Sequence, residues 1–183
     1  MPHRSGRLKK RENDSRVERN IMVFNNPKLR EILHAELCGR DGDLRWAAEK
    51  DFEPGIRLRL LSDKVIQEEI RKALASHGWV PPEGHQRLPD QVPWAWRYRP
   101  GTSCPCHKDT SPKDQWSLVI GVKTQGELIH INFGPGMVQS YSLLNGDMLL
   151  FRGAVFDHWT DTVDGLARVI VAWHLSLSNQ VPG

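Results

Sequence analysis

The fold of this chain is decided by residues 94–177, WAWRYRPGTSCPCHKDTSPKDQWSLVIGVKTQGELIHINFGPGMVQSYSLLNGDMLLFRGAVFDHWTDTVDGLARVIVAWHLSL. Short runs of β-branched and aromatic residues alternate here with Gly, Asp and Asn, a pattern typical of strands and tight turns. We expect strands at 94–99, 116–123, 127–133, 140–144, 148–151, 156–160 and 167–177. So many short strands in so few residues predict a two-sheet β-sandwich or jelly roll.

Two segments ahead of this stretch have the apolar spacing of helices. The first covers 27–37, with Asn25 or Asn26 as its cap, and the second covers 61–79, with Ser62 as its N-cap. A loop rich in turn residues follows at 81–93. The second helix is expected to bury Val65, Ile66, Ile70, Leu74 and Trp79. The chain is therefore predicted to be mainly β, with supporting N-terminal helices.

Length and charge suggest one domain with a basic tail. The chain has 183 residues and a net charge of +3. Residues 1–20 carry seven Lys or Arg and three Asp or Glu, so the rest of the chain is close to neutral. We expect a disordered tail over 1–20 and a single domain over 21–183. The tail is either a solvated leader or a segment that attracts nucleic-acid phosphate.

The cysteines and the hydropathy pattern indicate the cellular compartment that we expect for the protein. Cys38, Cys104 and Cys106 cannot form a complete disulfide framework, which favours a reducing cytoplasm. No apolar run is long enough for a membrane helix, and the basic N-terminus lacks the apolar region of a secretory signal. A zinc site at Cys104-Pro-Cys106-His107 would need further ligands, and Cys38 is the one other thiol.

Four residues are candidates for a functional site, three as metal ligands and one as a carboxylate-binding arginine. His107 and Asp109 are two residues apart, so in an extended segment both side chains leave the same face. His158, on a late strand, is the candidate third ligand. Two His and one carboxylate on one face of an ion are the facial triad of non-haem Fe(II) oxygenases. Arg168 opens an apolar strand, where a guanidinium needs a carboxylate partner, and a dicarboxylate co-substrate meets that need.

Residues 94–177 resemble the Fe(II)/2-oxoglutarate dioxygenases, and among them the AlkB-like proteins. AlkB-like proteins carry Arg-Tyr-x-Pro-Gly, five further residues and His-x-Asp. This chain has Arg97-Tyr98-Arg99-Pro100-Gly101 and then His107-Lys108-Asp109 at that spacing. Later family features correspond to Ser117–Gly121, Phe133-Gly134, Gly146-Asp147, His158 and Arg168. The position of Arg168 also suits the TET/JBP-like branch of the superfamily.

The resemblance implies a double-stranded β-helix supported by the N-terminal helices, and a role for each matching residue. His107, Asp109 and His158 would hold Fe(II), and Arg168 would bind the distal carboxylate of 2-oxoglutarate with help from the Tyr98 hydroxyl. His174 stands where AlkB-like proteins have a second arginine, so it is a further candidate for co-substrate binding. The implied reaction uses O2 to oxidise 2-oxoglutarate to succinate and CO2, with hydroxylation or demethylation of a substrate.

The residues leave the substrate open. AlkB-like spacing and the basic tail favour a methylated or otherwise modified nucleobase, presented in single-stranded or flipped form. Trp96 and Ile170 stand where family members have Asn, which changes the packing around the co-substrate. Thr110 and Ser111 replace the acidic residue that often reads the base, and this loss, the near-neutral body and the short stretch ahead of the barrel favour a small molecule or a protein side chain. A different class, a jelly-roll binding module without catalysis, predicts that iron and 2-oxoglutarate do not bind together. The oligomeric state is left unassigned.

Overall fold

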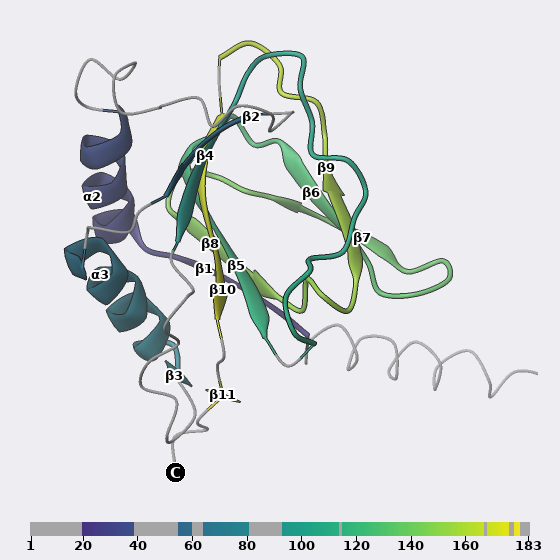
Figure 1. Ribbon diagram of the computed structural model, residues 1–183, viewed down its shortest axis with the longest axis horizontal. Coiled ribbons are helices and arrows are strands. Elements are labelled where there is room, and N and C mark those ends of the chain that lie inside the picture. Colours follow the sequence, from purple (N-terminus) through teal and green to yellow (C-terminus); the bar gives the residue numbers. More distant parts are fainter. Residues whose placement is uncertain are drawn as a thin grey trace, which may run out of the picture.

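Two antiparallel sheets packed face to face dominate the computed structural model (Figure 1). The structure describes residues 20–38, 55–59, 64–80, 93–113, 115–166, 168–175 and 178–179. A six-stranded sheet has the order β1-β8-β5-β10-β4-β2, and a three-stranded sheet has the order β7-β6-β9. Two sheets of such short strands form a jelly roll, as the sequence predicts.

The elements have the following bounds. The helices are α2 (Pro27–Cys38) and α3 (Lys64–Ala75). The large sheet contains β1 (Ile21–Asn25), β2 (Gly55–Arg59), β4 (Trp94–Tyr98), β5 (Trp116–Lys123), β8 (Asp147–Phe151) and β10 (Arg168–Leu175). The small sheet contains β6 (Leu128–Asn132), β7 (Val138–Ser142) and β9 (Asp157–Thr160). A separate pair is formed by β3 (Trp79–Val80) and β11 (Ser178–Asn179).

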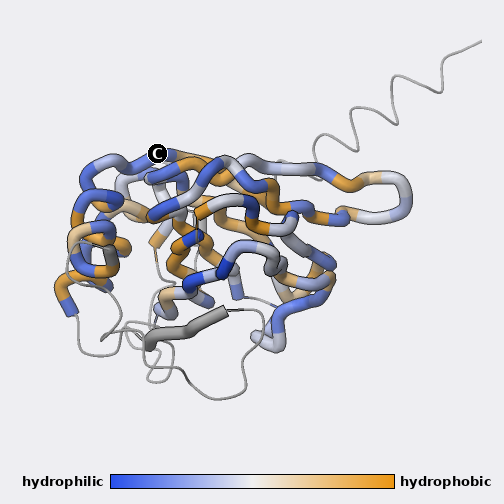
Figure 2. Tube along the Cα trace, turned by 90° about the horizontal axis from the view of Figure 1, so that it is seen from above, coloured by the Kyte–Doolittle hydropathy of each residue, from blue (hydrophilic) through white to orange (hydrophobic). Residues whose placement is uncertain are grey.

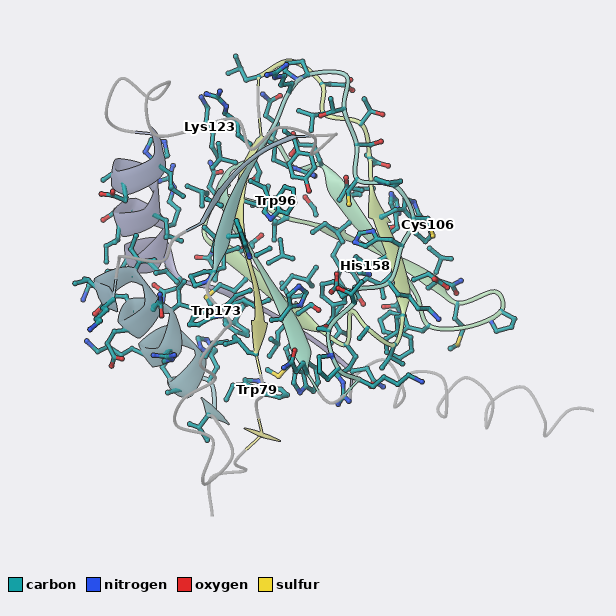
Figure 3. The ribbon with its side chains drawn as sticks, in the orientation of Figure 1. Trp79, Trp96, Cys106, Lys123, His158 and Trp173 are labelled. Atoms are coloured by element: carbon teal, nitrogen blue, oxygen red, sulfur yellow. The ribbon has the colours of Figure 1, made fainter. Side chains whose placement is uncertain are left out.

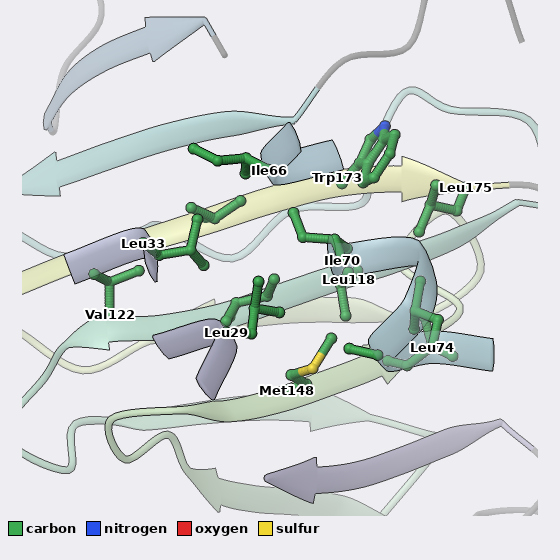
Figure 4. Close-up of a cluster of buried hydrophobic side chains, with 14 of the residues drawn as sticks. Leu29, Leu33, Ile66, Ile70, Leu74, Leu118, Val122, Met148, Trp173 and Leu175 are labelled. Atoms are coloured by element: carbon green, nitrogen blue, oxygen red, sulfur yellow. The ribbon is translucent and has the colours of Figure 1, made fainter. Parts of the chain in front are cut away.

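The helices cover one face of the large sheet, on the side away from the small sheet (Figure 1). Every second residue of a strand points to the same face. On β10 the residues Val169, Val171, Trp173 and Leu175 therefore belong to the helix-side core, together with Leu33, Ile70 and Leu118 (Figure 4). Hydrophobic residues gather among the helices and central strands, and hydrophilic ones occupy many of the outer turns (Figure 2).

A second apolar cluster lies between the two sheets. It includes Ile129 and Ile131 from β6, Leu149 and Phe151 from β8, and Ile170 from β10. Gly121 on β5 lets the chain at Leu144 approach, because a Cβ at Gly121 would overlap the Leu144 carbonyl oxygen. The space between the sheets is thus partly filled with apolar side chains, and the remainder holds polar ones described below.

The helix predictions are partly correct. Asn26 caps α2, since its side-chain Oδ1 accepts a hydrogen bond from the Leu29 amide at 2.9 Å. The helix expected over 61–79 is wrong at its end: α3 stops at Ala75, and Gly78 takes a φ of 80°, which ends a helix. Trp79 begins β3 instead, where it is still buried. Val65 is 67% exposed, not buried, whereas Ile66, Ile70 and Leu74 are buried as predicted.

Each of the seven predicted strands has a counterpart in the structure, most of them with somewhat different bounds, and the structure has further strands. The strand expected at 140–144 is Val138–Ser142, because Asp147 Oδ2 accepts a hydrogen bond from the Leu144 amide at 2.8 Å and holds 144–147 as a turn. The last strand, expected over 167–177, is Arg168–Leu175. Strands β1, β2, β3 and β11 are additional to the prediction. Ser62, the 81–93 loop apart from Pro93, and the 1–20 tail apart from Asn20 lie outside the described residues.

Within the described residues, neither helix has the length and hydropathy needed to span a membrane.

Candidate metal centre and carboxylate site

Three predicted residues meet between the two sheets. His107 forms an isolated antiparallel bridge with His158 of β9, through paired backbone hydrogen bonds of 3.0 and 2.9 Å. The Asp109 amide donates to the Gly153 carbonyl at 3.1 Å, which anchors the same loop to the chain after β8. One ligand atom from each of His107, Asp109 and His158 lies within 4.8 Å of the others. This is the one such group of three in the part of the chain that the structure describes.

Each imidazole presents the same nitrogen to the centre. His107 Nδ1 lies 2.8 Å from the Pro105 carbonyl oxygen, and His158 Nδ1 lies 3.1 Å from the Phe156 carbonyl oxygen. Because a carbonyl only accepts, each Nδ1 carries a proton, and Nε2 is the nitrogen left for a metal. The two Nε2 atoms lie 3.7 and 3.6 Å from Asp109 Oδ1. Bonds of roughly 2 Å at right angles bring ligand atoms roughly 3 Å apart, so a small closure brings these donors onto one ion.

The second oxygen of Asp109 has its own partners. Ser117 Oγ donates to Asp109 Oδ2 at 2.5 Å, and His174 Nδ1 lies 3.7 Å from the same oxygen. His174 Nδ1 also lies 3.4 Å from Ser117 Oγ. Ser117 and His174 are paired across β5 and β10, so two neighbouring side chains of the large sheet contact the Asp109 oxygen that does not face His107 and His158.

The charges of these three side chains depend on one another. The Asp109 carboxylate, whose Oδ1 lies 3.7 Å from His107 Nε2, and then the Cys104 contact raise the pKa of His107 to about 11 despite its partial burial. Burial by itself would raise the pKa of Asp109, but the nearby His107 and the hydrogen bond from Ser117 outweigh it and lower the pKa to about 2. Burial lowers the pKa of His158. These shifts make His107 an imidazolium, Asp109 a carboxylate and His158 a neutral imidazole near pH 7.

Arg168 forms a second polar site on the inner face of β10. Its side chain is 2% exposed, and its guanidinium carbon lies 4.3 Å from the Tyr98 ring centroid. One terminal nitrogen donates to Thr160 Oγ1 at 3.2 Å, while Nε is buried without a hydrogen-bond partner. No carboxylate among the described residues forms an ion pair with Arg168. A buried guanidinium with donors to spare can bind an anion, and Arg168 is the candidate for that role here.

Tyr98, which lies beside Arg168, is also buried. Tyr98 is directly opposite Arg168 in the pairing of β4 with β10 and is 5% exposed. Burial raises the pKa of Tyr98, so its hydroxyl stays protonated and available as a donor. Trp96, two residues earlier on β4, stacks on the Tyr98 ring with centroids 6.3 Å apart. Figure 3 shows Trp96 and His158 between the two sheets and Trp173 on the helix side.

The two polar sites are connected by one strand. His158 and Thr160 are both on β9 and two residues apart, so their side chains leave the same face. His158 contributes to the metal centre and Thr160 contacts Arg168. The structure thus brings five predicted residues into one interior region: His107, Asp109, His158, Arg168 and Tyr98.

His174, the further candidate for co-substrate binding, lies at the opposite end of the site from Arg168. It is on the same face of β10 as Arg168 but six residues away, roughly 20 Å along an extended strand. Its contacts are with Asp109 and Ser117 at the metal centre, and its side chain is 37% exposed. The structure therefore places His174 beside the metal ligands and away from Arg168.

Sequence reasoning missed three residues of the site. Thr160 had a usable signal, because it stands two residues after His158 on a strand. Ser117 lies in a stretch that resembles the AlkB-like pattern, but nothing in the sequence assigns Ser117 or Gly153 a contact with Asp109, because these contacts depend on how separate segments pack. A Cβ at Gly153 would overlap both Asp109 Oδ2 and Ser117 Oγ. Only glycine leaves room there for the carboxylate and the hydroxyl together.

Comparison with solved structures relates this arrangement to known proteins. No protein-family model matches the sequence, and no curated protein matches it. A prolyl-4-hydroxylase of Pseudomonas putida has a TM-score of 0.62 at 14% identity, over 85% of this chain and 91% of that one. HygX of Streptomyces hygroscopicus, solved with nickel and 2-oxoglutarate, has a TM-score of 0.61 at 13% identity, over 90% of this chain and 85% of that one.

A third similar structure comes from a virus. The viral collagen prolyl hydroxylase vCPH of Paramecium Bursaria Chlorella virus-1, solved as a 2-oxoglutarate complex, has a TM-score of 0.55 at 14% identity. The match covers 85% of this chain and 95% of that chain. At these identities the likeness concerns the fold. The chain has the double-stranded β-helix fold of the 2-oxoglutarate and Fe(II) oxygenases.

Proposed function

We propose that this protein is an Fe(II)- and 2-oxoglutarate-dependent dioxygenase that hydroxylates or oxidatively demethylates its substrate. One observation carries the proposal. A His-Asp-His ligand set and a buried arginine without a carboxylate partner lie between the same two sheets, joined by His158 and Thr160 of β9. A metal site alone or a buried arginine alone has many explanations, but their combination matches the two ends of a metal-chelating dicarboxylate.

The donor set fits ferrous iron. Two neutral imidazole nitrogens and one carboxylate oxygen on one side of an ion leave about three octahedral positions open. In this chain the ligands would be Nε2 of His107, Nε2 of His158 and Oδ1 of Asp109. Bound Fe(II), with O2 and 2-oxoglutarate, supplies the oxidising chemistry that converts a substrate C–H bond to C–OH and releases succinate and CO2. The hydrogen bonds from each Nδ1 to a backbone carbonyl hold the rings in the ligating orientation.

The dicarboxylate would lie along β9. Two residues of a strand advance roughly 6.6 Å, about the span of a five-carbon dicarboxylate. Arg168 and the Thr160 hydroxyl would bind its distal carboxylate, and the protonated Tyr98 hydroxyl would donate to it. Trp96 and Ile170 are paired on β4 and β10 and lie next to Tyr98 and Arg168, where they would exclude water from the bound co-substrate. We infer that His174 acts at the metal end of the site.

Two substrate classes follow from different observations. The Arg97–Gly101 and His107–Asp109 motif supports an AlkB-like enzyme acting on a modified nucleobase, in single-stranded or flipped form, and the basic residues of 1–20 fit such a partner. The prolyl hydroxylases among the similar structures support a protein side chain, and HygX leaves a small molecule open. Free thiols at Cys104 and Cys106 support a reducing, cytoplasmic setting.

An anaerobic titration tests the proposal. Fe(II) and 2-oxoglutarate added together should give a visible charge-transfer band that neither gives alone, and Arg168→Ala should weaken it. No band in folded protein would overturn the proposal and favour a binding module. Succinate release with N-methylated and 5-methylpyrimidine oligonucleotides, and with proline-containing peptides, then separates the substrate classes.

A further inference from the structure

The two oxygens of Asp109 are in different environments. Oδ1 faces the Nε2 atoms of His107 and His158, at 3.7 and 3.6 Å. Oδ2 points the other way and accepts the Ser117 hydroxyl at 2.5 Å. A hydrogen bond from a hydroxyl to a carboxylate is short and strong compared with a neutral one. Ser117 is 3% exposed, so water does not compete for this bond.

The backbone restricts the same carboxylate from a second direction. The Asp109 amide donates to the Gly153 carbonyl at 3.1 Å, so the two segments are fastened together. A Cβ at Gly153 would overlap Asp109 Oδ2, which means that this oxygen is packed against the Gly153 backbone. Rotating the carboxylate to bring both oxygens toward the histidines would break the Ser117 bond and leave the buried hydroxyl without that acceptor.

We propose that Ser117 is a positioning residue that restricts Asp109 to metal ligation through Oδ1 alone. The inference rests on the proposed metal centre. It adds that Ser117 determines how many coordination positions of the ion the three side chains fill. Carboxylates ligate metals through one or both oxygens. With one oxygen, the three side chains fill three of about six positions of an octahedral ion. With both, only two positions remain, and a chelating 2-oxoglutarate would occupy them and leave none for O2.

Bound water on Mn(II) gives a readout that does not depend on turnover. Mn(II) accepts the same imidazole and carboxylate donors, and its enhancement of water-proton relaxation scales with the number of exchanging waters it carries. In the wild-type protein, bound Mn(II) should carry three exchanging water molecules. Chelation by 2-oxoglutarate should displace two of them and leave one water on the metal. In Ser117→Ala, the released Oδ2 should displace one water, so the enhancement should fall by about a third. Adding 2-oxoglutarate to this variant should remove the inner-sphere contribution almost completely.

Two further variants separate positioning from packing. Ser117→Thr keeps the hydroxyl and should restore the wild-type relaxation enhancement. Ser140→Ala makes the same chemical change on the outer face of β7, where the Ser140 hydroxyl lies 2.8 Å from His130 Nδ1, and should leave the enhancement unchanged. If Ser117→Ala does not fold, Ser117→Cys takes its place, since a thiol of similar size is a weak donor.

The outcomes distinguish this inference from the proposed function. Equal enhancement in wild type and Ser117→Ala, with Mn(II) bound to both, overturns the role of Ser117 and leaves the metal centre intact. A Ser117→Thr value as low as that of Ser117→Ala also overturns it, because the hydroxyl then makes no difference. Failure of the wild type to bind Mn(II) overturns the metal centre itself.

Discussion

The two faces of β10 show how one strand serves two purposes. Val169, Val171, Trp173 and Leu175 face the helices, and each is at most 6% exposed. On the opposite face, Arg168 and His174 are polar, and Arg168 is buried without a carboxylate partner among the described residues. Burial of apolar surface stabilises the first face, whereas desolvation of a cation makes the second one costly. We therefore expect substitutions on the two faces to separate stability from function.

The largest effect is expected at the metal centre. Asp109→Ala removes the one carboxylate ligand, so Fe(II)-dependent succinate formation should disappear completely. The free energy of unfolding of the metal-free protein should change far less than activity, since Asp109 is outside both apolar cores. Asp161→Ala, which removes a carboxylate 2.8 Å from His130 on the outer side of the small sheet, is the matched control for succinate formation. Retained turnover in Asp109→Ala would contradict the ligand assignment.

A substitution in the core between the helices and the large sheet is expected to lower stability and to leave metal binding unchanged. Leu118 on β5 is 0% exposed within the helix-side core, so Leu118→Ala should lower the free energy of unfolding by about 2–5 kcal/mol. Metal affinity measured well below the unfolding temperature should stay close to wild type. Leu144→Ala makes the same change at a residue that is 55% exposed and should cost less than about 0.5 kcal/mol. A comparable loss in both variants would argue against a packed helix–sheet layer. Urea unfolding curves measure both.

An intermediate effect is expected at Arg168, where stability and binding should move in opposite directions. Arg168→Met removes a buried guanidinium whose Nε lacks a partner, so the ligand-free protein should be as stable as wild type or more so. The affinity for 2-oxoglutarate should fall about 10–100-fold, since a hydrogen bond to a charged group is worth about 1.5–3 kcal/mol. Arg99→Met, at an exposed arginine, should change neither quantity. Destabilisation of ligand-free Arg168→Met would show that the arginine supports the fold.

The smallest effect is a pH dependence of metal binding. The pKa of His107 is raised to about 11 by Asp109 and Cys104, so at neutral pH a metal must displace the proton of this imidazolium. His158, with its lowered pKa, is already neutral and releases none. Mn(II) affinity should therefore rise about tenfold per pH unit between pH 7 and 8. Calorimetry in buffers of different ionisation enthalpy should count one proton released, and a count of zero would contradict a charged His107.

Local patterns made much of this structure predictable. Alternation along 168–175 predicts a strand with two faces, and the Asn26 cap follows from residue type at a helix start. The spacing of His107, Asp109 and His158 predicts a shared ion, and the structure brings these residues together. The double-stranded β-helix fold is confirmed by solved structures with TM-scores up to 0.62.

Other features depend on contacts between distant segments. The pairing of β1 with β8 joins residues more than a hundred positions apart, and the sequence of Ile21–Asn25 does not indicate which strand it pairs with. Ser117 donates to Asp109, eight residues earlier in the chain, and residue types alone do not predict this contact. Val65 fits an apolar stripe by spacing, but the sheet meets the helix through Ile66 and Ile70, so Val65 is left outside. Periodicity predicts a helix face but not its rotation against a neighbour.

The position of β10 has a consequence for how the chain acquires its shape. This strand lies between β5 and β4, yet it follows both of them in the sequence. Until residues 168–175 have been made by the ribosome, β5 and β4 each lack a neighbour on one side, and the large sheet exists at most as two separate parts. Exposed strand edges invite pairing with other chains, and long-range pairing is slow. Arg168 arrives on the same strand, so the nascent chain completes its sheet and gains the side chain proposed to bind the co-substrate in a single late step.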